Sequence, residues 1–251
     1  MNVIINGALG YMGRLLTKKV EDAPDMEIAA LVDHDSDGES IYKSLSDVSA
    51  TWNDNGNAGE YIVIDFSNAA GTEALLEFGL ANKIPLLIAT TGQSDEQRNL
   101  IKEASKEIPL FYSGNMSLGV ALLADLVRQT VSKFPDADVE IIETHHVRKV
   151  DAPSGTALLL ANAAKEARPT LETNVGRNGS SKRGVNEIGI SSVRRGNIVG
   201  IHEVIISTES QSITLKHEAH DRGLFADGAI SAAKFLVNQT PGLYDMKSLI
   251  D

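Results

Sequence analysis

The feature that most constrains the fold is a set of three evenly spaced glycines near the start of the chain. Val3–Asn6 has the continuous apolar character of a buried strand, and Met12–Ala23 has the periodicity of an amphipathic helix. Gly7, Gly10 and Gly13 lie at the junction between them. A buried strand that turns through glycines into a helix is typical of α/β folds, in which helices cover both faces of a parallel sheet.

Apolar strands and amphipathic helices continue to alternate until about residue 115. Strands are expected at Glu27–Asp33, Tyr61–Phe66, Leu86–Thr90 and Leu110–Ser113, with helices at Thr72–Asn82 and Asp95–Lys106. Such alternation is typical of doubly wound parallel sheets. We therefore expect a Rossmann-like domain in the first half of the chain.

The second half has a different pattern, in which strands follow one another without intervening helices. The expected helices are Leu118–Phe134, Ser154–Ala167 and Ala226–Asn238, and the expected strands are Val139–Thr144, Glu187–Arg195, Ile198–Ser207 and Ser212–His217. Residues 174–186 are rich in glycine, asparagine, serine and basic residues, which indicates a mobile loop. Consecutive strands late in the chain predict a second, α+β domain.

Composition excludes several kinds of function. The 251 residues include no cysteine, which rules out disulfides, thiolate catalysis and cysteine-based metal centres. The formal net charge is −11 and no basic face is evident, which argues against nucleic-acid binding. No apolar run is long enough to span a bilayer, and no basic leader precedes the first strand, so we expect a cytoplasmic protein.

The glycine junction predicts a dinucleotide site. Gly7 permits a tight turn, Gly10 lets backbone N–H groups approach a pyrophosphate, and Gly13 lets the helix pack close to the strand. Asp33 ends the second strand, where its carboxylate would bind ribose hydroxyls and repel a 2′-phosphate, which favours NADH over NADPH. The neighbouring His34 would tolerate NADPH or serve no purpose. The alternative is an ordinary β–α turn with Asp33 on a loop.

Further cofactor contacts are expected at the carboxyl ends of the strands, where ligands cross an open parallel sheet. The full set of expected cofactor residues is Gly7, Ala8, Leu9, Gly10, Tyr11, Met12, Asp33, His34, Ala89, Thr90, Thr91, Ser113, Gly114, Asn115 and Met116. Ordinary turn chemistry accounts equally well for the residues after the fourth and fifth strands.

Two adjacent histidines and a lysine follow the strand Val139–Thr144. His145 and His146 point to opposite faces if the strand continues, so one can enter a cleft as a proton donor. Lys149 is a fixed cation that would bind an anionic substrate and could act as a second acid. A hydride donor together with a proton donor predicts a reductase.

The segment Ser154-Gly155-Thr156 opens a helix and offers N–H groups and hydroxyls to a carboxylate. The alternative is a hydrogen-bonded histidine pair, a solvated lysine, and Ser154 as a helix N-cap. A metal site formed by Glu143, His145 and His146 is disfavoured, because adjacent histidines of a strand diverge and Lys149 would repel a cation. We therefore expect no metal.

The run Glu143-x-His145-His146-x-x-Lys149-x-Asp151-Ala152-Pro153-Ser154-Gly155-Thr156-Ala157 resembles the signature of the dihydrodipicolinate reductase family. That family, now called 4-hydroxy-tetrahydrodipicolinate reductase, acts in bacterial lysine and diaminopimelate biosynthesis. The Gly-x-x-Gly-x-Met turn, Thr-Thr-Gly at 90–92, Asn115-Met116-Ser117 and Phe225-Ala226-Asp227-Gly228-Ala229 also match in order.

The resemblance implies hydride transfer from NAD(P)H to ring C4 of a cyclic unsaturated dicarboxylate. It implies that His145 and Lys149 are the acids, and that the substrate contacts are His146, Lys149, Gly155 and Thr156, to which the helix start adds Ser154. It also implies a nucleotide-binding domain of residues 1–116 with 222–251. The central domain, residues 117–221, would carry an open mixed sheet, bind substrate and form a homotetramer.

Some positions depart from the family pattern. His34 stands where some relatives have arginine, Ala89 replaces a glycine, Asn68-Ala69 lacks a proline, Ile201 replaces a glutamate and Asp227 replaces an asparagine. None of these departures removes an expected catalytic group. Two alternative functions stay open: an oxidoreductase for another imine or aldehyde, and an NAD(H)-sensing protein without catalysis.

Overall fold

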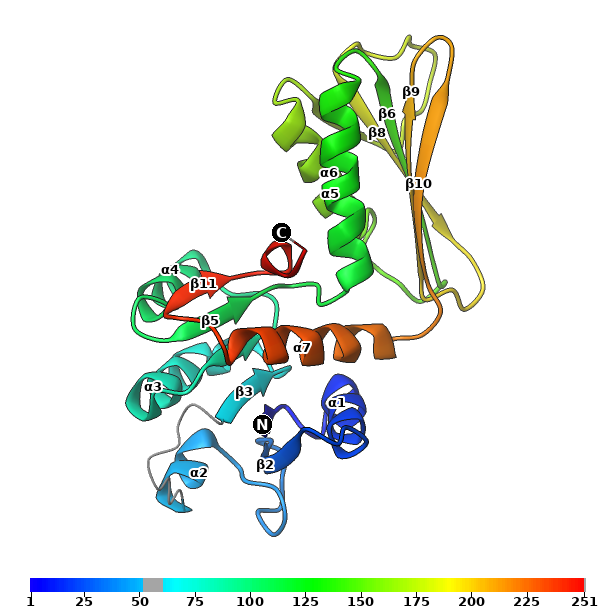
Figure 1. Cartoon of the computed structure of the whole chain (residues 1–251). Helices are drawn as coiled ribbons and strands as arrows, with labels where there is room; N and C mark the ends of the chain where they lie inside the picture. The colour runs from blue at the N-terminus through cyan, green and yellow to red at the C-terminus, as the bar shows by residue number, and fades with distance from the viewer. Residues whose placement is uncertain (52–60, 251) are drawn as a thin grey trace. The chain divides into compact units, whose positions relative to one another are not determined.

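The structure, a computed structural model, describes residues 1–51 and 61–250 and contains two separate β-sheets (Figure 1). Each sheet belongs to its own unit of the chain. The first unit is Met1–Ser117 with Gly223–Asp251, and the second is Leu118–Arg222. The boundaries expected from the sequence, after residues 116 and 221, lie one residue before these.

The sheet of the first unit has six parallel strands in the order β11-β5-β4-β3-β1-β2. These are β1 (Asn2–Asn6), β2 (Glu27–Val32), β3 (Tyr61–Asp65), β4 (Leu86–Ile88), β5 (Pro109–Tyr112) and β11 (Gly242–Tyr244). From β1 the chain winds first to β2 on one side and then to β3, β4 and β5 on the other. This reversal of strand order beside β1 confirms the expected doubly wound topology and creates a binding crevice at the carboxyl ends.

Two groups of helices cover this sheet. Helix α1 (Tyr11–Glu21) packs against α7 (Gly223–Leu236), while α2 (Leu45–Thr51), α3 (Thr72–Asn82) and α4 (Asp95–Ala104) pack in succession and share a core with Ile4 of β1. Lys19 of α1 pairs with Asp227 of α7 at 2.5 Å, which gives the unusual aspartate a partner. No helix within residues 1–51 and 61–250 combines the length and the apolar character needed to cross a membrane.

One helix and two strands of the structure were not predicted from the sequence. Helix α2 is short and polar, and β11 has three residues and depends on pairing with β5. The third is β7, described below. Two 3-10 turns, η2 (Ala69–Gly71) and η3 (Lys247–Leu249), complete the first unit.

The second unit contains a mixed sheet of five strands in the order β10-β9-β6-β8-β7. The strands are β6 (Asp138–His145), β7 (Glu172–Val175), β8 (Glu187–Arg194), β9 (Gly200–Ser207) and β10 (Ser212–Ala219). Strand β6 runs parallel to β8 and antiparallel to β9, so the expected mixed sheet is confirmed. Helices α5 (Leu118–Lys133) and α6 (Gly155–Ala167) pack together on one face over an apolar core.

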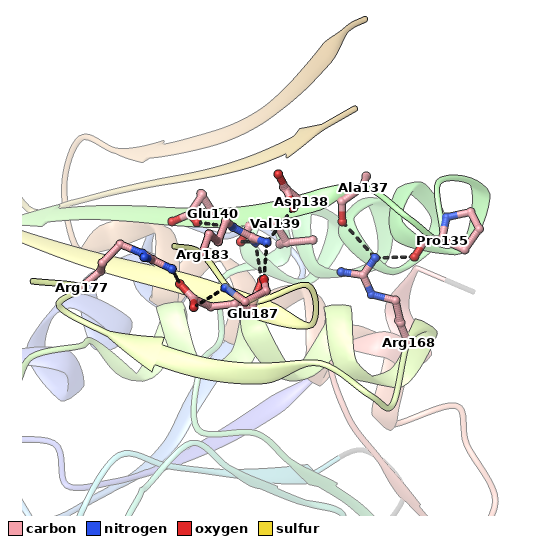
Figure 2. A network of polar contacts seen from close by, with 10 residues as sticks. Pro135, Ala137, Asp138, Val139, Glu140, Arg168, Arg177, Arg183 and Glu187 are labelled. Atoms are coloured by element: carbon pink, nitrogen blue, oxygen red, sulfur yellow. Dashed lines mark hydrogen bonds and ion pairs between the residues drawn. The ribbon is translucent and has the colours of Figure 1, made fainter. Parts of the chain in front are cut away.

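The segment expected to be a mobile loop, 174–186, is partly a strand and is tied to the sheet (Figure 2). Its first two residues belong to β7, which pairs with β8. Arg183 donates to Asp138 at 2.6 Å and to Glu140 at 3.1 Å, both on β6. Arg177 forms an ion pair with Glu187 at the start of β8. Its basic residues therefore anchor the loop, which the composition alone did not reveal.

Candidate active site

The glycine turn of the first unit requires glycine at two of its three positions for steric reasons. Gly7 has a φ of +86°, and a Cβ there would lie 2.6 Å from the carbonyl oxygen of Phe66. A Cβ on Gly13 would lie 2.0 Å from the carbonyl oxygen of Gly7, so α1 packs directly on the turn. At Gly10 the nearest atom would be 3.3 Å away, so this position is less crowded.

Most backbone donors of the turn are engaged within the protein. The N–H groups of Gly7 and Ala8 donate to the carbonyl of Val32 at 2.9 and 3.1 Å, and that of Gly10 donates to Gly7 at 3.2 Å. The donors that a pyrophosphate could use therefore lie further along than expected. Helix geometry leaves the N–H groups of the first turn of α1 without acceptors inside the helix.

Asp33 has a structural contact that the sequence did not reveal. Its carboxylate accepts the N–H of Leu9 at 2.9 Å and the N–H of Asp35 at 3.1 Å. Its neighbour His34 is exposed and lies between two carboxylates, with Nε2 3.1 Å from Asp35. Asp33 thus holds the glycine turn in place as well as facing the cavity beside it.

A cavity of about 670 Å³ adjoins the turn and is lined by Gly7, Leu9, Gly10, Asp33 and His34. Its far side is formed by residues that the sequence analysis missed, namely Lys43, Ser44, Ser46 and Ser49 around the start of α2 and Ala74, Glu77, Phe78 and Ala81 of α3. They carried no local signal, because only the packing of α2 and α3 brings them to the end of β2. The cavity and the glycine turn fit a dinucleotide.

The segments that follow β4 and β5 lie next to each other at the same sheet edge. A Cβ on Gly114 would lie 3.2 Å from the Thr91 side chain. Ser113 and Asn115 use their side chains in local turn contacts, Ser113 Oγ with the carbonyl of Asn115 at 2.9 Å and Asn115 Oδ1 with the N–H of Ser117 at 2.9 Å. Ala89, Thr90 and Met116 are buried.

Buried Asp65 at the end of β3 is a polar group of this edge that the sequence analysis missed. It accepts hydrogen bonds from Asn6 at 2.7 Å and from the Ser67 hydroxyl at 2.5 Å. Burial raises the pKa of its carboxyl.

In the second unit, the end of β6 carries a buried carboxylate and imidazole pair. Glu143 and His145 are two residues apart and therefore share a strand face. Nδ1 of His145 lies 2.5 Å from Oε2 of Glu143, which is fully buried. Arg194 of β8 binds both oxygens of that carboxylate, at 2.9 and 2.7 Å. The sequence alone does not place Arg194 beside His145, because the two become neighbours only through the pairing of β6 with β8.

Charges around the pair favour an ionised glutamate. Burial would raise the pKa of Glu143, but Arg194 and His145 bring it down to about 2. Burial lowers the pKa of His145, with Glu143 opposing this effect. His202 of β9 packs edge-on against His145 with ring centroids 5.1 Å apart. Burial lowers the pKa of His202 to about 4.

Ser154, an expected substrate ligand, is enclosed and makes several contacts within the protein. It is 2% exposed, caps α6 by accepting the N–H of Ala157 at 3.2 Å, and contacts His202 at 3.1 Å. Its own N–H donates to Glu143 at 3.2 Å. The hydroxyl is therefore the N-cap of the alternative interpretation, while the backbone N–H ties the helix start to the Glu143 carboxylate.

The remaining expected substrate residues lie near the ends of β6 and α6. His146 is half-buried, its N–H donates to Ile198 at 2.8 Å, and its buried Nδ1 has no protein partner among the described residues. Lys149 forms an ion pair with Asp151 at 2.9 Å. Gly155 begins α6, and a Cβ there would meet no atom within 4 Å. Thr156 follows it in the first turn.

The three metal ligands that were considered and disfavoured from the sequence, Glu143, His145 and His146, do not all come together. Glu143 and His145 do come together, but the third potential ligand within 4.8 Å is His202 instead of His146. The Arg194 guanidinium already occupies the Glu143 carboxylate and adds positive charge. That no metal is used stays a prediction.

The first unit has a parallel sheet with a glycine turn at its switch point, and the second unit has an ionisable histidine. This combination is typical of an NAD(P)H-dependent oxidoreductase. Comparisons with known proteins identify the family. The family model described as "Dihydrodipicolinate reductase, N-terminus" matches residues 1–116, and the corresponding "C-terminus" model matches residues 119–250. The chain belongs to the dihydrodipicolinate reductase family.

The relatives cover the full chain. A 4-hydroxy-tetrahydrodipicolinate reductase of Caldanaerobacter subterraneus subsp. tengcongensis is 41% identical, with 100% of this chain and 98% of the relative aligned. One from Caulobacter vibrioides is 43% identical, with 100% and 97% aligned. The structure of a dipicolinate-bound dihydrodipicolinate reductase from Paenisporosarcina sp. TG-14 matches with a TM-score of 0.78 and 25% identity, covering 98% of this chain and 97% of that one.

These findings confirm the resemblance and the predicted reductase. The chain reduces 4-hydroxy-tetrahydrodipicolinate with NAD(P)H, a step of lysine biosynthesis. The sensing protein and the reductase of another imine or aldehyde are thereby set aside as its main function.

Proposed function

We propose that His145 is the proton donor of this reduction, and that Lys149, His146 and the start of α6 bind the substrate carboxylates. The observation that carries the proposal is the shared Glu143 carboxylate. It accepts from the Ser154 backbone at 3.2 Å and contacts the His145 ring at 2.5 Å, so one buried group fixes both the acid and the helix start. An acid beside an anion-binding helix end suits reduction of an anionic ring.

The substrate is a ring that carries two carboxylates. The Paenisporosarcina relative binds dipicolinate, and a compound of the same kind suits the cations of this site. We infer that one carboxylate meets the N–H groups of Gly155 and Thr156, because Ser154 is enclosed. The other carboxylate binds the ammonium group of Lys149, either in place of Asp151 or together with it. The partnerless buried Nδ1 of His146 supports a ligand contact there.

When bound, a reduced nicotinamide cofactor would supply the hydride that C4 of the ring accepts. The electron pair displaced within the substrate must then be protonated, and the imidazolium of His145 donates that proton. Lys149 balances the negative charge and is the second acid.

As the test, His145→Gln should lower kcat by roughly a hundredfold or more, which is the usual contribution of a positioned acid. A near-normal kcat would remove this role.

The assay measures NADH and NADPH oxidation by nicotinamide absorbance, with substrate generated in situ by a coupled synthase from pyruvate and aspartate semialdehyde. Synthase-dependent oxidation, corrected with blanks for each reagent, is the expected result. Failure with both cofactors, in a folded protein that still binds NADH, would contradict turnover of this substrate and support a sensing role instead.

We propose that both cofactors are accepted and that NADH is preferred. The Asp33 carboxylate at the cavity favours ribose hydroxyls and opposes a 2′-phosphate. Lys43 lines the same cavity beside His34 and supplies positive charge for NADPH. Lys43→Ala should therefore lower kcat/KM for NADPH by roughly tenfold while changing the NADH value by less than about twofold, as expected for one charge-assisted contact. Equal losses with both cofactors would contradict this assignment.

We further propose that the second unit forms a homotetramer through the face of its sheet that lies opposite α5 and α6. Along β9, Val204 and Ile206 enter the core while Ile201 and Ile205 point to the other face. Ile142 of β6 lies on this outer face as well. The same face carries charged residues such as Glu203 and Lys216, and a mixed face with several isoleucines is suited to burial against another subunit. Placing the isoleucine at position 201 there is consistent with that use.

A further inference from the structure

Glu143 and His145 form a pair that the strand geometry makes rigid. Residues two apart on β6 project to the same side, which sets Nδ1 of His145 2.5 Å from the Glu143 carboxylate. Both side chains are enclosed, at 0% exposure for Glu143 and 10% for His145. Gly200 of β9 leaves room for the ring, because a Cβ there would lie 3.1 Å from Nε2.

Arg194 holds the carboxylate from the neighbouring strand. Its two terminal nitrogens lie 2.9 and 2.7 Å from the two oxygens of Glu143, and one of them also donates to the carbonyl of Asp151 at 2.7 Å. A two-point guanidinium contact fixes the plane of the carboxylate. Because a buried carboxylate with this partner stays ionised, it can only accept hydrogen bonds, and its contact with Nδ1 requires a proton on that nitrogen.

We propose that Glu143, clamped by Arg194, is the positioning residue that keeps the proton of His145 on Nδ1 and so makes Nε2 the nitrogen that exchanges a proton with the substrate. When the imidazolium donates, the Nε2–H bond breaks, its electron pair stays on the ring, and neutral His145 keeps its Nδ1–H on Glu143. The inference rests on the proposed proton-donor role. It adds the residues that set which nitrogen acts.

Glu143 and Arg194 also affect the pKa of the His145 ring. Four groups act on His145: Glu143 on its own strand, Arg194 on β8 and Lys149 beyond the end of β6 through their charges, and His202 on β9 through ring packing. Only Glu143 favours the imidazolium, while burial, Lys149 and Arg194 oppose it. Removing the Glu143 charge should therefore move the basic limb of the kcat profile to lower pH, an effect that a purely structural glutamate would not have.

The first test does not depend on turnover. Nitrogen-15 NMR of the intact protein, with His145→Gln used to assign the signal, should show neutral His145 as the Nδ1–H tautomer. A neutral ring with its proton on Nε2 would overturn the proposal. This readout is separate from the proton-donor role, which fails instead if His145→Gln keeps its kcat.

The second test compares two glutamates of the same strand. Glu143→Gln should lower kcat by roughly a hundredfold, leave the substrate KM within about threefold, and shift the basic limb by about one pH unit or more. The matched control is Glu140→Gln, which removes a glutamate–arginine contact with Arg183 on the opposite face of β6 and should leave kcat, the substrate KM and the basic limb unchanged.

Combining variants separates action through His145 from any other effect. In the His145→Gln background, Glu143→Gln should cause almost no further loss of kcat, because its partner is already gone. An equal loss in both backgrounds would overturn the proposal. If Glu143→Gln does not fold, Glu143→Asp and the wild-type NMR signal serve the same purpose, and Glu143→Asp should keep the Nδ1–H tautomer and more activity than a neutral substitute.

Discussion

His202 is a buried side chain that makes the free energy of unfolding depend on pH. Its ring contacts Ser154 at the start of α6 and packs against His145. Burial lowers its pKa to about 4 from an ordinary value of 6.5. The unfolded chain therefore binds a proton at this residue between about pH 6.5 and pH 4, while the folded chain does not.

This difference predicts acid destabilisation in a defined window. The free energy of unfolding should fall as the pH drops from about 6.5 to about 4, with His202 contributing at most roughly 3 kcal/mol. His202→Gln cannot take up this proton, so its urea unfolding should depend less on pH at a fixed protein concentration. Identical pH dependence in the variant and the wild type would contradict the prediction.

Two glycines at helix starts have opposite reasons to be small. Gly13 packs against the turn, where a Cβ would lie 2.0 Å from a carbonyl oxygen, whereas a Cβ on Gly155 would meet nothing within 4 Å. The sequence predicts that Gly13 lets a helix pack close to a strand and that Gly155 lies at a helix start open to a carboxylate. The structure adds the crowding of backbone atoms at Gly13 and the open space at Gly155.

Substitution by alanine tests this distinction. Gly13→Ala should destabilise the protein by about 2 kcal/mol or more, because backbone atoms must move. Gly155→Ala should leave the unfolding midpoint unchanged or slightly raised, since alanine suits a helix better. It should nevertheless raise the substrate KM several-fold if a carboxylate approaches this helix end. An unchanged KM would contradict that contact.

The anchored segment 174–186 shows what composition misses within an element. Glycine, asparagine and basic residues are typical of loops, yet Arg183 and Arg177 pair with carboxylates of β6 and β8 (Figure 2). The partners of Arg183, which are Asp138 and Glu140, lie 45 and 43 residues away in sequence. Helix α2 and strands β7 and β11 were missed for a related reason, since short elements gain most of their stability from the neighbours they pack on.

At the level of the assembled protein, the proposed tetramer gives a prediction about mass. Ile205→Asp places a charge on the outer face of the second sheet and should reduce the molar mass measured by light scattering after size exclusion. The control is Leu100→Asp on α4 of the first unit, an exposed leucine whose replacement should leave the mass unchanged. A wild-type chain that elutes as a monomer, or an Ile205→Asp variant that stays tetrameric, would contradict the proposed interface.

The amino-acid sequence by itself determined the parallel α/β sheet, the later mixed sheet and the family. These depend on local periodicity, on glycine spacing and on one dense motif around His145, all of which are visible along the chain. The tertiary structure decided which groups surround that histidine. Arg194 and His202 lie 49 and 57 residues away in sequence but reach it through strand pairing, and Ser154 is drawn inward by the same contacts. Contacts between strands depend on register, which no local pattern of side chains records.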